Sequence, residues 1–214
     1  MDTLIKKIPP YTLWCISEKN LIHFSEFVAN ANYLIHQKKY APDWEIQDVL
    51  EHETELYPHS VFFVLKDAGE QYIGAIRATL WDGTFHLPMD REFGIDIRQV
   101  INDRGLHPTE IWHVARFAVH SYKNIGLSIN FDERLKIIRI LLSSVIKLIC
   151  RHDNNVMLAE CDERFLNINP FIGIIGNEII GESLMYLGSP TIPVINTAKN
   201  LSLFLEKNNI LSHV

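Results

Sequence analysis

The sequence contains only three cysteines, and it has no uninterrupted apolar stretch long enough to cross a membrane. Cys15, Cys150 and Cys161 form no C-x-x-C pair and lie among apolar residues, which favours reduced core thiols over a disulfide framework or a zinc site. The longest apolar run, residues 137–150, is interrupted by two basic residues. We therefore predict no metal site and no transmembrane segment. Because the first residues lack the pattern of a signal peptide, we expect a cytoplasmic location.

A basic excess is also missing. The formal net charge is -6, which argues against a nucleic-acid partner because neutralising phosphates requires clustered Lys and Arg. The composition of 47% hydrophobic and 21% charged residues is that of an ordinary globular protein. No internal repeat, low-complexity tract or linker rich in Pro, Gly and Ser divides the chain, so we predict one domain over residues 1–214.

Hydrophobic periodicity predicts the element order β-α-ββ-β-α-β-α-β-α. The expected strands are residues 11–17, 60–67, 72–83, 110–120, 155–163 and 182–195, and the expected helices are residues 18–37, 129–153, 164–173 and 198–209. Residues 37–60 are polar and aperiodic, which predicts a long loop of the kind that forms lids or insertions. This mixed order favours an α/β or α+β fold whose central sheet carries helices on both faces.

The strand at residues 110–120 contains two polar residues in an apolar setting. Burying His113 and Arg116 costs free energy unless both are paired or used in function. In a regular strand, residues three apart point to opposite faces. A bulge at Val114 or Ala115 would turn both side chains to one side, and bulges are frequent beside active sites.

Two segments carry a resemblance to a known family. The first is "GAIRATLWDGTFHLPMDREFGIDI", in which an arginine strand is followed by a Leu-Pro and an Arg-Glu-Phe segment, and the second is "EIWHVARFAVH". Together they resemble the acyl-homoserine lactone synthases and the long-chain N-acyl amino acid synthases, which belong to the GCN5-related N-acetyltransferase (GNAT) superfamily. The resemblance implies a GNAT-like, mostly antiparallel sheet and an enzyme that transfers an acyl group from a thioester to an amine.

The resemblance also implies site residues. Arg77 and Arg116 match the two sheet arginines of the family, and they would fix a carboxylate on the acceptor or brace acids of the lid. His113 stands where the family has a glutamate that acts on the amine acceptor, so it is the predicted base. Candidate substrate contacts are Trp44, Glu53, Glu55, Trp81, Phe117, Val119 and Tyr186.

The residues themselves leave other interpretations open. His113 also fits a core histidine bonded to a backbone carbonyl, and each arginine fits a structural salt bridge. The tryptophans fit either an acyl tunnel or the core, and Tyr186 fits packing as well as proton donation to a leaving thiolate. A nucleophilic role for Cys161 is disfavoured, since no histidine lies nearby in sequence and direct transfer suffices in this superfamily.

The donor site differs from that of ordinary acetyltransferases, which hold the pyrophosphate of coenzyme A on a Gly-rich turn. Residues 120–136 offer only Gly126 for such a turn, and Asp132 and Glu133 would repel a pyrophosphate from the first turn of the helix. We predict no tightly bound cofactor, with an acyl carrier protein or acyl-coenzyme A as the donor. Lys136 and Arg139 are candidate donor contacts. They share a helix face with Lys147, Arg151 and Ser143, which fits either docking of an acidic carrier or a solvated surface.

These patterns together predict an N-acyltransferase that acts on a small amine, with an amino acid as the expected acceptor. Two alternatives remain open. One is a conventional acetyl-coenzyme A-dependent N-acetyltransferase of the GNAT superfamily. The other is an inactive member that binds an acyl chain or a signal molecule.

Overall fold

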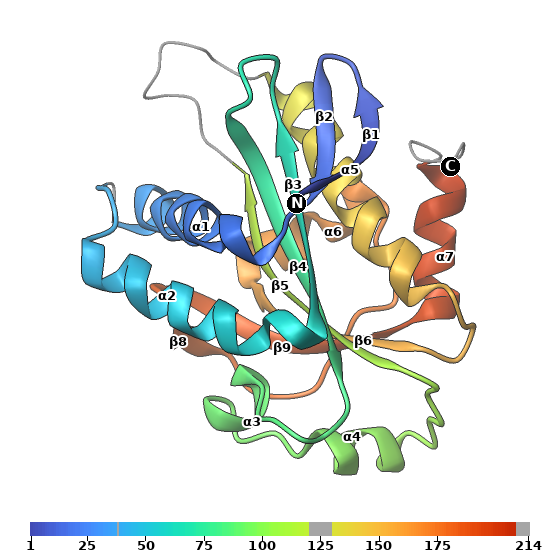
Figure 1. Cartoon of the computed structure of the whole chain (residues 1–214). Helices are drawn as coiled ribbons and strands as arrows, with labels where there is room; N and C mark the ends of the chain where they lie inside the picture. The colour runs from blue at the N-terminus through green and yellow to red at the C-terminus, as the bar shows by residue number, and fades with distance from the viewer. Residues whose placement is uncertain (38, 120–129, 209–214) are drawn as a thin grey trace. The chain divides into compact units, whose positions relative to one another are not determined.

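The computed structural model describes residues 1–37, 39–119 and 130–208. Groups of one to three strands alternate with groups of one or two α-helices along these residues (Figure 1). The strands are β1 (Thr3–Ile8), β2 (Tyr11–Cys15), β3 (Ser60–Lys66), β4 (Tyr72–Trp81), β5 (Ile111–Val119), β6 (Val156–Asp162), β7 (Glu178–Ile179), β8 (Leu184–Tyr186) and β9 (Ser189–Thr197). The α-helices are α1 (Leu21–His36), α2 (Asp43–Leu56), α3 (Pro88–Arg91), α4 (Ile97–Asp103), α5 (Phe131–Ile149), α6 (Glu163–Ile172) and α7 (Ala198–Lys207).

The strands of the described residues form a nine-stranded sheet in the order β1-β2-β3-β4-β5-β6-β9-β7, and β8 pairs with β9. β5 runs parallel to β6. The pairings β1–β2, β2–β3, β6–β9, β7–β9 and β8–β9 are antiparallel. The predicted mixed, mostly antiparallel α/β fold is therefore confirmed.

The chain forms two compact units, and each combines two separate stretches of sequence. The first unit contains Met1–Ala78 and Arg116–Leu142, and the second contains Thr79–Ala115 and Ser143–Val214. β4, β5 and α5 each contribute residues to both units. The single domain that the sequence leads us to expect stays a prediction.

The core of the first unit lies between α1 and the strands. Leu21, Phe24, Val28 and Ala31 recur at helical spacing, and all four are buried, as the sequence pattern predicts. They pack in one hydrophobic cluster with side chains of β3 and β4. The rings of Phe24 and Phe62 meet edge to face with their centroids 5.0 Å apart.

The opposite face of β4 is covered by α5. A Cβ added to Gly74 would lie 2.6 Å from Cδ1 of Leu141 and 3.3 Å from Cγ2 of Ile137. The adjacent Ala75 belongs to the cluster formed with α1. Since successive side chains of a strand point to opposite faces, helices cover both faces of β4 within the first unit.

The prediction of a long loop over residues 37–60 is wrong, because this segment contains the helix α2. Pro42 precedes the helix and Pro58 follows it, so the two prolines mark its ends. The buried side chains of α2 are Val49, Glu53 and Leu56, which lie at helical spacing. The central residue of this stripe is an acid, which hides the apolar period. α1 and α2 lie side by side (Figure 1).

The core of the second unit lies against β6 and β9. Val156, Leu158 and Ile195 form one hydrophobic cluster with side chains from α3, α4 and the segment that joins β4 to α3. The predicted element order lacked α3 and α4, and it also lacked β1, α2 and β7. The single strand predicted for residues 182–195 is the hairpin β8–β9, whose turn residues Leu187 and Gly188 both have positive φ, 48° and 85°.

The predicted helix α5 begins as the sequence indicates. The side-chain Oδ1 of Asn130 accepts a hydrogen bond of 2.8 Å from the backbone N–H of Glu133. From Ile137 onward almost every residue of α5 is buried or half-buried. Within the described ranges, no helix combines the length and the apolar character needed to cross a membrane.

Candidate functional site

The position of His113 follows from the register of β5 on β6. His113 lies opposite Leu158, and Ile111 lies opposite Val156. Side chains of directly paired residues point to the same face of a sheet, so His113 shares a face with the apolar cluster around Leu158. Glu160 follows Leu158 by two residues in β6 and therefore also points to this face.

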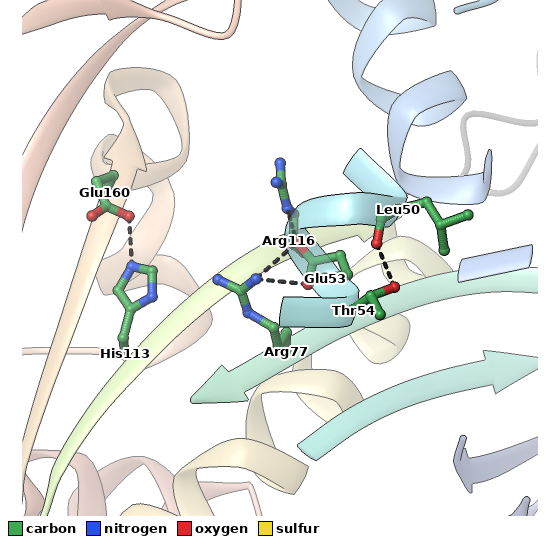
Figure 2. A network of polar contacts seen from close by, with 7 residues as sticks. All are labelled: Leu50, Glu53, Thr54, Arg77, His113, Arg116 and Glu160. Carbon is green, nitrogen blue, oxygen red and sulfur yellow. Dashed lines mark hydrogen bonds and ion pairs between the residues drawn. The ribbon is translucent and has the colours of Figure 1, made fainter. Parts of the chain in front are cut away.

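His113 and Glu160 form a buried pair. Nε2 of His113 lies 2.7 Å from Oε2 of Glu160, and the two side chains are 0% and 5% exposed. Figure 2 shows the imidazole directed at the carboxylate across the two strands. The other ring nitrogen, Nδ1, is buried and has no hydrogen-bond partner among the described residues. One imidazole nitrogen is therefore bonded to a carboxylate, and the other has no partner among the described residues, unlike a core histidine that is satisfied by a backbone carbonyl.

Cys161 follows this glutamate in β6. Burial, together with the neighbouring carboxylates of Glu160 and Asp162, raises the pKa of the Cys161 thiol to about 12. A thiol with this pKa is protonated at neutral pH, so it does not supply a thiolate nucleophile. That Cys161 plays no covalent role stays a prediction, which this raised pKa supports.

β5 is irregular at a different residue from the one we expect. We predict a bulge at Val114 or Ala115, but the residue in the left-handed region is Arg116, with φ of 56°. A non-glycine residue in this region costs free energy and is typical of bulges and functional segments. The parallel ladder with β6 is described from Ile111 to His113, before this irregularity.

The two predicted arginines meet one acid in the first unit. Nη1 of Arg77 lies 2.7 Å from Oε1 and 2.6 Å from Oε2 of Glu53, and Nε of Arg116 lies 2.7 Å from Oε1 (Figure 2). Arg77 follows Ala75 by two residues and Arg116 precedes Ala118 by two, and both alanines pack against α1. Arg77 therefore points to the sheet face that carries α1 and α2, and the bond to Glu53 of α2 places the Arg116 guanidinium on the same face.

This cluster is almost fully buried. The side chains of Arg77, Glu53 and Arg116 are 1%, 0% and 15% exposed. Burial alone would raise the pKa of Glu53, but the two guanidinium groups outweigh it and lower the pKa to about 2. The sequence left open whether the arginines hold an acceptor carboxylate or brace an acid of the segment before β3. The observed contacts are of the bracing kind.

The other predicted contact residues are dispersed. Glu55 is exposed on α2, and Trp44 on the same helix is 61% exposed. Trp81 is buried and donates from Nε1 to the carbonyl of Phe85 at 2.9 Å. Tyr186 packs edge to face on Phe93 at 5.6 Å. In β5, Phe117 is half-buried and Val119 is buried.

The predicted donor contacts lie on α5. Lys136 is half-buried, and its Nζ lies 3.4 Å from the carbonyl oxygen of Pro9 and 5.6 Å from the ring centroid of Tyr11. Arg139 is also half-buried. Ser143, which we place on the same face, is buried at 1% exposure, so it does not form part of a surface. The expected lack of a phosphate-binding turn around Gly126 concerns residues outside the described ranges.

The described part of the second unit contains two open pockets beside the end of β4. They have volumes of about 460 and about 270 Å³, and Trp81 and Arg98 line both. The larger is also lined by apolar Phe85, Ile95 and Ile97. Among the described residues, no group of three His, Cys, Asp or Glu side chains is arranged to hold a metal ion.

Comparison with known proteins identifies the fold class. No family model matches the chain, and neither does any curated protein. Solved structures do match over nearly the whole chain, and they include a GNAT-family acetyltransferase from Staphylococcus aureus Mu50, with a TM-score of 0.53, 13% identity, and coverage of 88% of this chain and 99% of that one. The chain therefore has the GNAT fold, and the predicted superfamily resemblance is confirmed at the level of fold.

Two particular neighbours are acyl synthases. FeeM, an N-acyl amino acid synthase from uncultured soil microbes, matches with a TM-score of 0.59 and 18% identity over 92% of this chain and 96% of FeeM. The AHL synthase LasI matches with a TM-score of 0.56 and 11% identity over 92% of this chain and 95% of LasI. The fold is thus also that of the synthase branch that the two sequence segments resemble.

The sequence reasoning missed Glu160 as a functional candidate. The signal is present in "VMLAECD", where Val156 and Leu158 face the core and Glu160 is the next residue on the same face. A carboxylate in a core-facing position needs a partner. The partner, His113, lies 47 positions away in sequence and is found only through the register of β5 on β6.

Proposed function

We propose that this protein is an N-acyltransferase that moves an acyl group from a thioester to the amine of a small acceptor, with an amino acid as the acceptor. The observation that carries the proposal is the buried imidazole of His113, whose Nδ1 has no partner among the described residues. The GNAT fold, shared with FeeM and LasI, supports the acyl-transfer chemistry. As donors we propose an acyl carrier protein or acyl-coenzyme A.

The reaction needs a neutral amine at a thioester carbonyl. We assign His113 the role of general base, which takes a proton from the acceptor amine as its nitrogen attacks the carbonyl carbon. A C–N bond forms, and the C–S bond then breaks. The thiolate leaves and takes up the proton held by the imidazole, so the products are an amide and a free thiol.

The arginines receive a different role in this proposal. Nη1 of Arg77 bonds to both carboxylate oxygens of Glu53 from α2, and this pairing supports a structural role for the guanidinium group. We propose that Arg77 and Arg116 act as positioning residues that attach α2 to the sheet. Guanidinium groups suit this task because their planar donor arrangement matches a carboxylate.

The test offers the purified protein a set of acyl-carrier-protein and acyl-coenzyme A thioesters of different chain lengths, together with the common amino acids, and detects N-acyl products by mass. We expect His113→Gln to lower turnover by about 10² to 10⁴-fold, the usual contribution of a general base. His107→Ala is the matched control, because this histidine is exposed in the same unit. Formation of an N-acetylated product from acetyl-coenzyme A alone would favour a conventional acetyltransferase. The absence of product from every thioester would refute the proposal that the protein is an acyltransferase.

A further inference from the structure

We infer that Glu160 is the positioning residue of the transferase reaction, and that it makes Nδ1 of His113 the atom that accepts the proton. This inference rests on the proposed function for its catalytic part. Its structural part, the protonation pattern of the His113 ring, stands independently and is measured independently.

The geometry restricts His113 to one orientation. Its Nε2 lies 2.7 Å from the Glu160 carboxylate, which has no proton to donate in its ionised form. A neutral imidazole carries one N–H, and a carboxylate oxygen at this distance requires that the N–H be on Nε2. The lone pair is then on Nδ1, the nitrogen without a partner among the described residues.

The apolar surroundings of His113 and Glu160 strengthen the hydrogen bond between them. His113 and Glu160 lie on the sheet face of an apolar cluster that contains Leu158. In such a setting a carboxylate and an imidazole are costly to bury apart, and a hydrogen bond between them is stronger than it would be in water. The pair therefore holds the ring in place and selects the tautomer.

Glu160 also matters after proton transfer. When Nδ1 takes the proton from the amine, the ring becomes an imidazolium beside the Glu160 carboxylate. The negative charge stabilises this cation without itself accepting the proton. When the thiolate leaves, Nδ1 returns the proton to sulfur, and the neutral Nε2–H tautomer is restored.

The first experiment measures the tautomer directly. The full chain is labelled with ¹⁵N-histidine, the His113 signals are identified by their loss in His113→Gln, and the ring nitrogens are followed by NMR as the pH is raised. We expect a neutral ring with its proton on Nε2 in the wild-type protein. In Glu160→Gln, whose amide both donates and accepts, we expect this preference to weaken and an Nδ1–H population to appear. A wild-type ring with its neutral proton on Nδ1 would overturn the inference, whether or not the protein proves to be an enzyme.

The second experiment compares turnover. We expect Glu160→Gln to lower kcat by about 10-fold or more while KM for the acceptor stays within about 2-fold, because the variant affects the base and not the binding of substrate. Glu182→Gln, an exposed acid of the same unit, is the matched control and should change neither value. A folded Glu160→Gln variant with wild-type kcat would refute the positioning role. If Glu160→Gln fails to fold, the wild-type tautomer alone decides the assignment.

Discussion

The substitution Glu53→Gln should reduce the stability of the protein by several kcal/mol at neutral pH. It keeps the shape of the side chain and removes the charge that binds Arg77 and Arg116. Glu53 has a folded-state pKa of about 2 instead of its usual 4.5. One pKa unit corresponds to about 1.4 kcal/mol, so ionised Glu53 contributes about 3 kcal/mol. Breaking a buried ion pair by removing one partner costs about 3 to 5 kcal/mol, which agrees.

The effect should depend on pH in one direction. Because folding lowers the pKa of Glu53, its contribution is fully present above pH 4.5 and is lost as the pH falls toward about 2. The stability deficit of Glu53→Gln relative to the wild type should therefore shrink over this range, since the wild-type side chain becomes neutral as well. The difference between the free energies of unfolding of the two proteins cancels the contributions of the other groups that titrate in acid.

The assay is urea unfolding followed by circular dichroism, at pH values from about 7 down to about 3. Glu55→Gln is the matched control: it removes an exposed carboxylate two residues away on the same helix and should change the free energy of unfolding by no more than about 0.5 kcal/mol. A deficit for Glu53→Gln below about 1 kcal/mol at pH 7, or one that does not change with pH, would refute the reasoning.

Two further predictions concern packing and chemistry. Gly74→Ala should destabilise the fold by about 1 to 3 kcal/mol in thermal unfolding, because its Cβ would lie 2.6 Å from the buried Leu141. The control Gly69→Ala meets only the side chain of Asp67 and should be nearly neutral. Equal effects of the two substitutions would contradict the close approach of α5 to Gly74. Cys161→Ala should retain acyl transfer in the mass assay, because a thiol with a pKa of about 12 supplies no thiolate at neutral pH. Loss of product in a folded variant would instead indicate a covalent step at this cysteine.

Much of the fold was predictable because apolar residues mark its main elements. α1 and α5 show clear helical periods, and β3 and β4 form the expected pair of runs separated by a turn. α2 was missed because its buried stripe contains Glu53, so the period of its apolar residues is broken by the residue that fixes the helix. β1 was missed for a related reason, since its side chains are mostly exposed and show no buried face.

The candidate site was predictable only in part. The arginines and His113 were identified because polar residues are costly inside strands. Bracing of a lid acid by the arginines was one expected alternative, but the sequence did not decide that this acid is Glu53, and it gave no sign that Glu160, 47 positions from His113, is the partner of the imidazole. Pairing over such separations is decided by strand register and helix packing, which no local pattern contains. That Trp44, Glu55 and Tyr186 contact the substrate stays a prediction.

The left-handed backbone at Arg116 places two demands on one position that no single replacement satisfies. Glycine adopts this conformation freely but has no guanidinium for Glu53, and lysine offers a charge without relieving the backbone. β-Branched residues fail on both counts. Variants at this position should therefore fall into two groups: those that lose the ion pair with Glu53 and those that keep a charge but do not fit the left-handed backbone. Arginine bears the backbone strain and in return supplies the guanidinium group that binds Glu53.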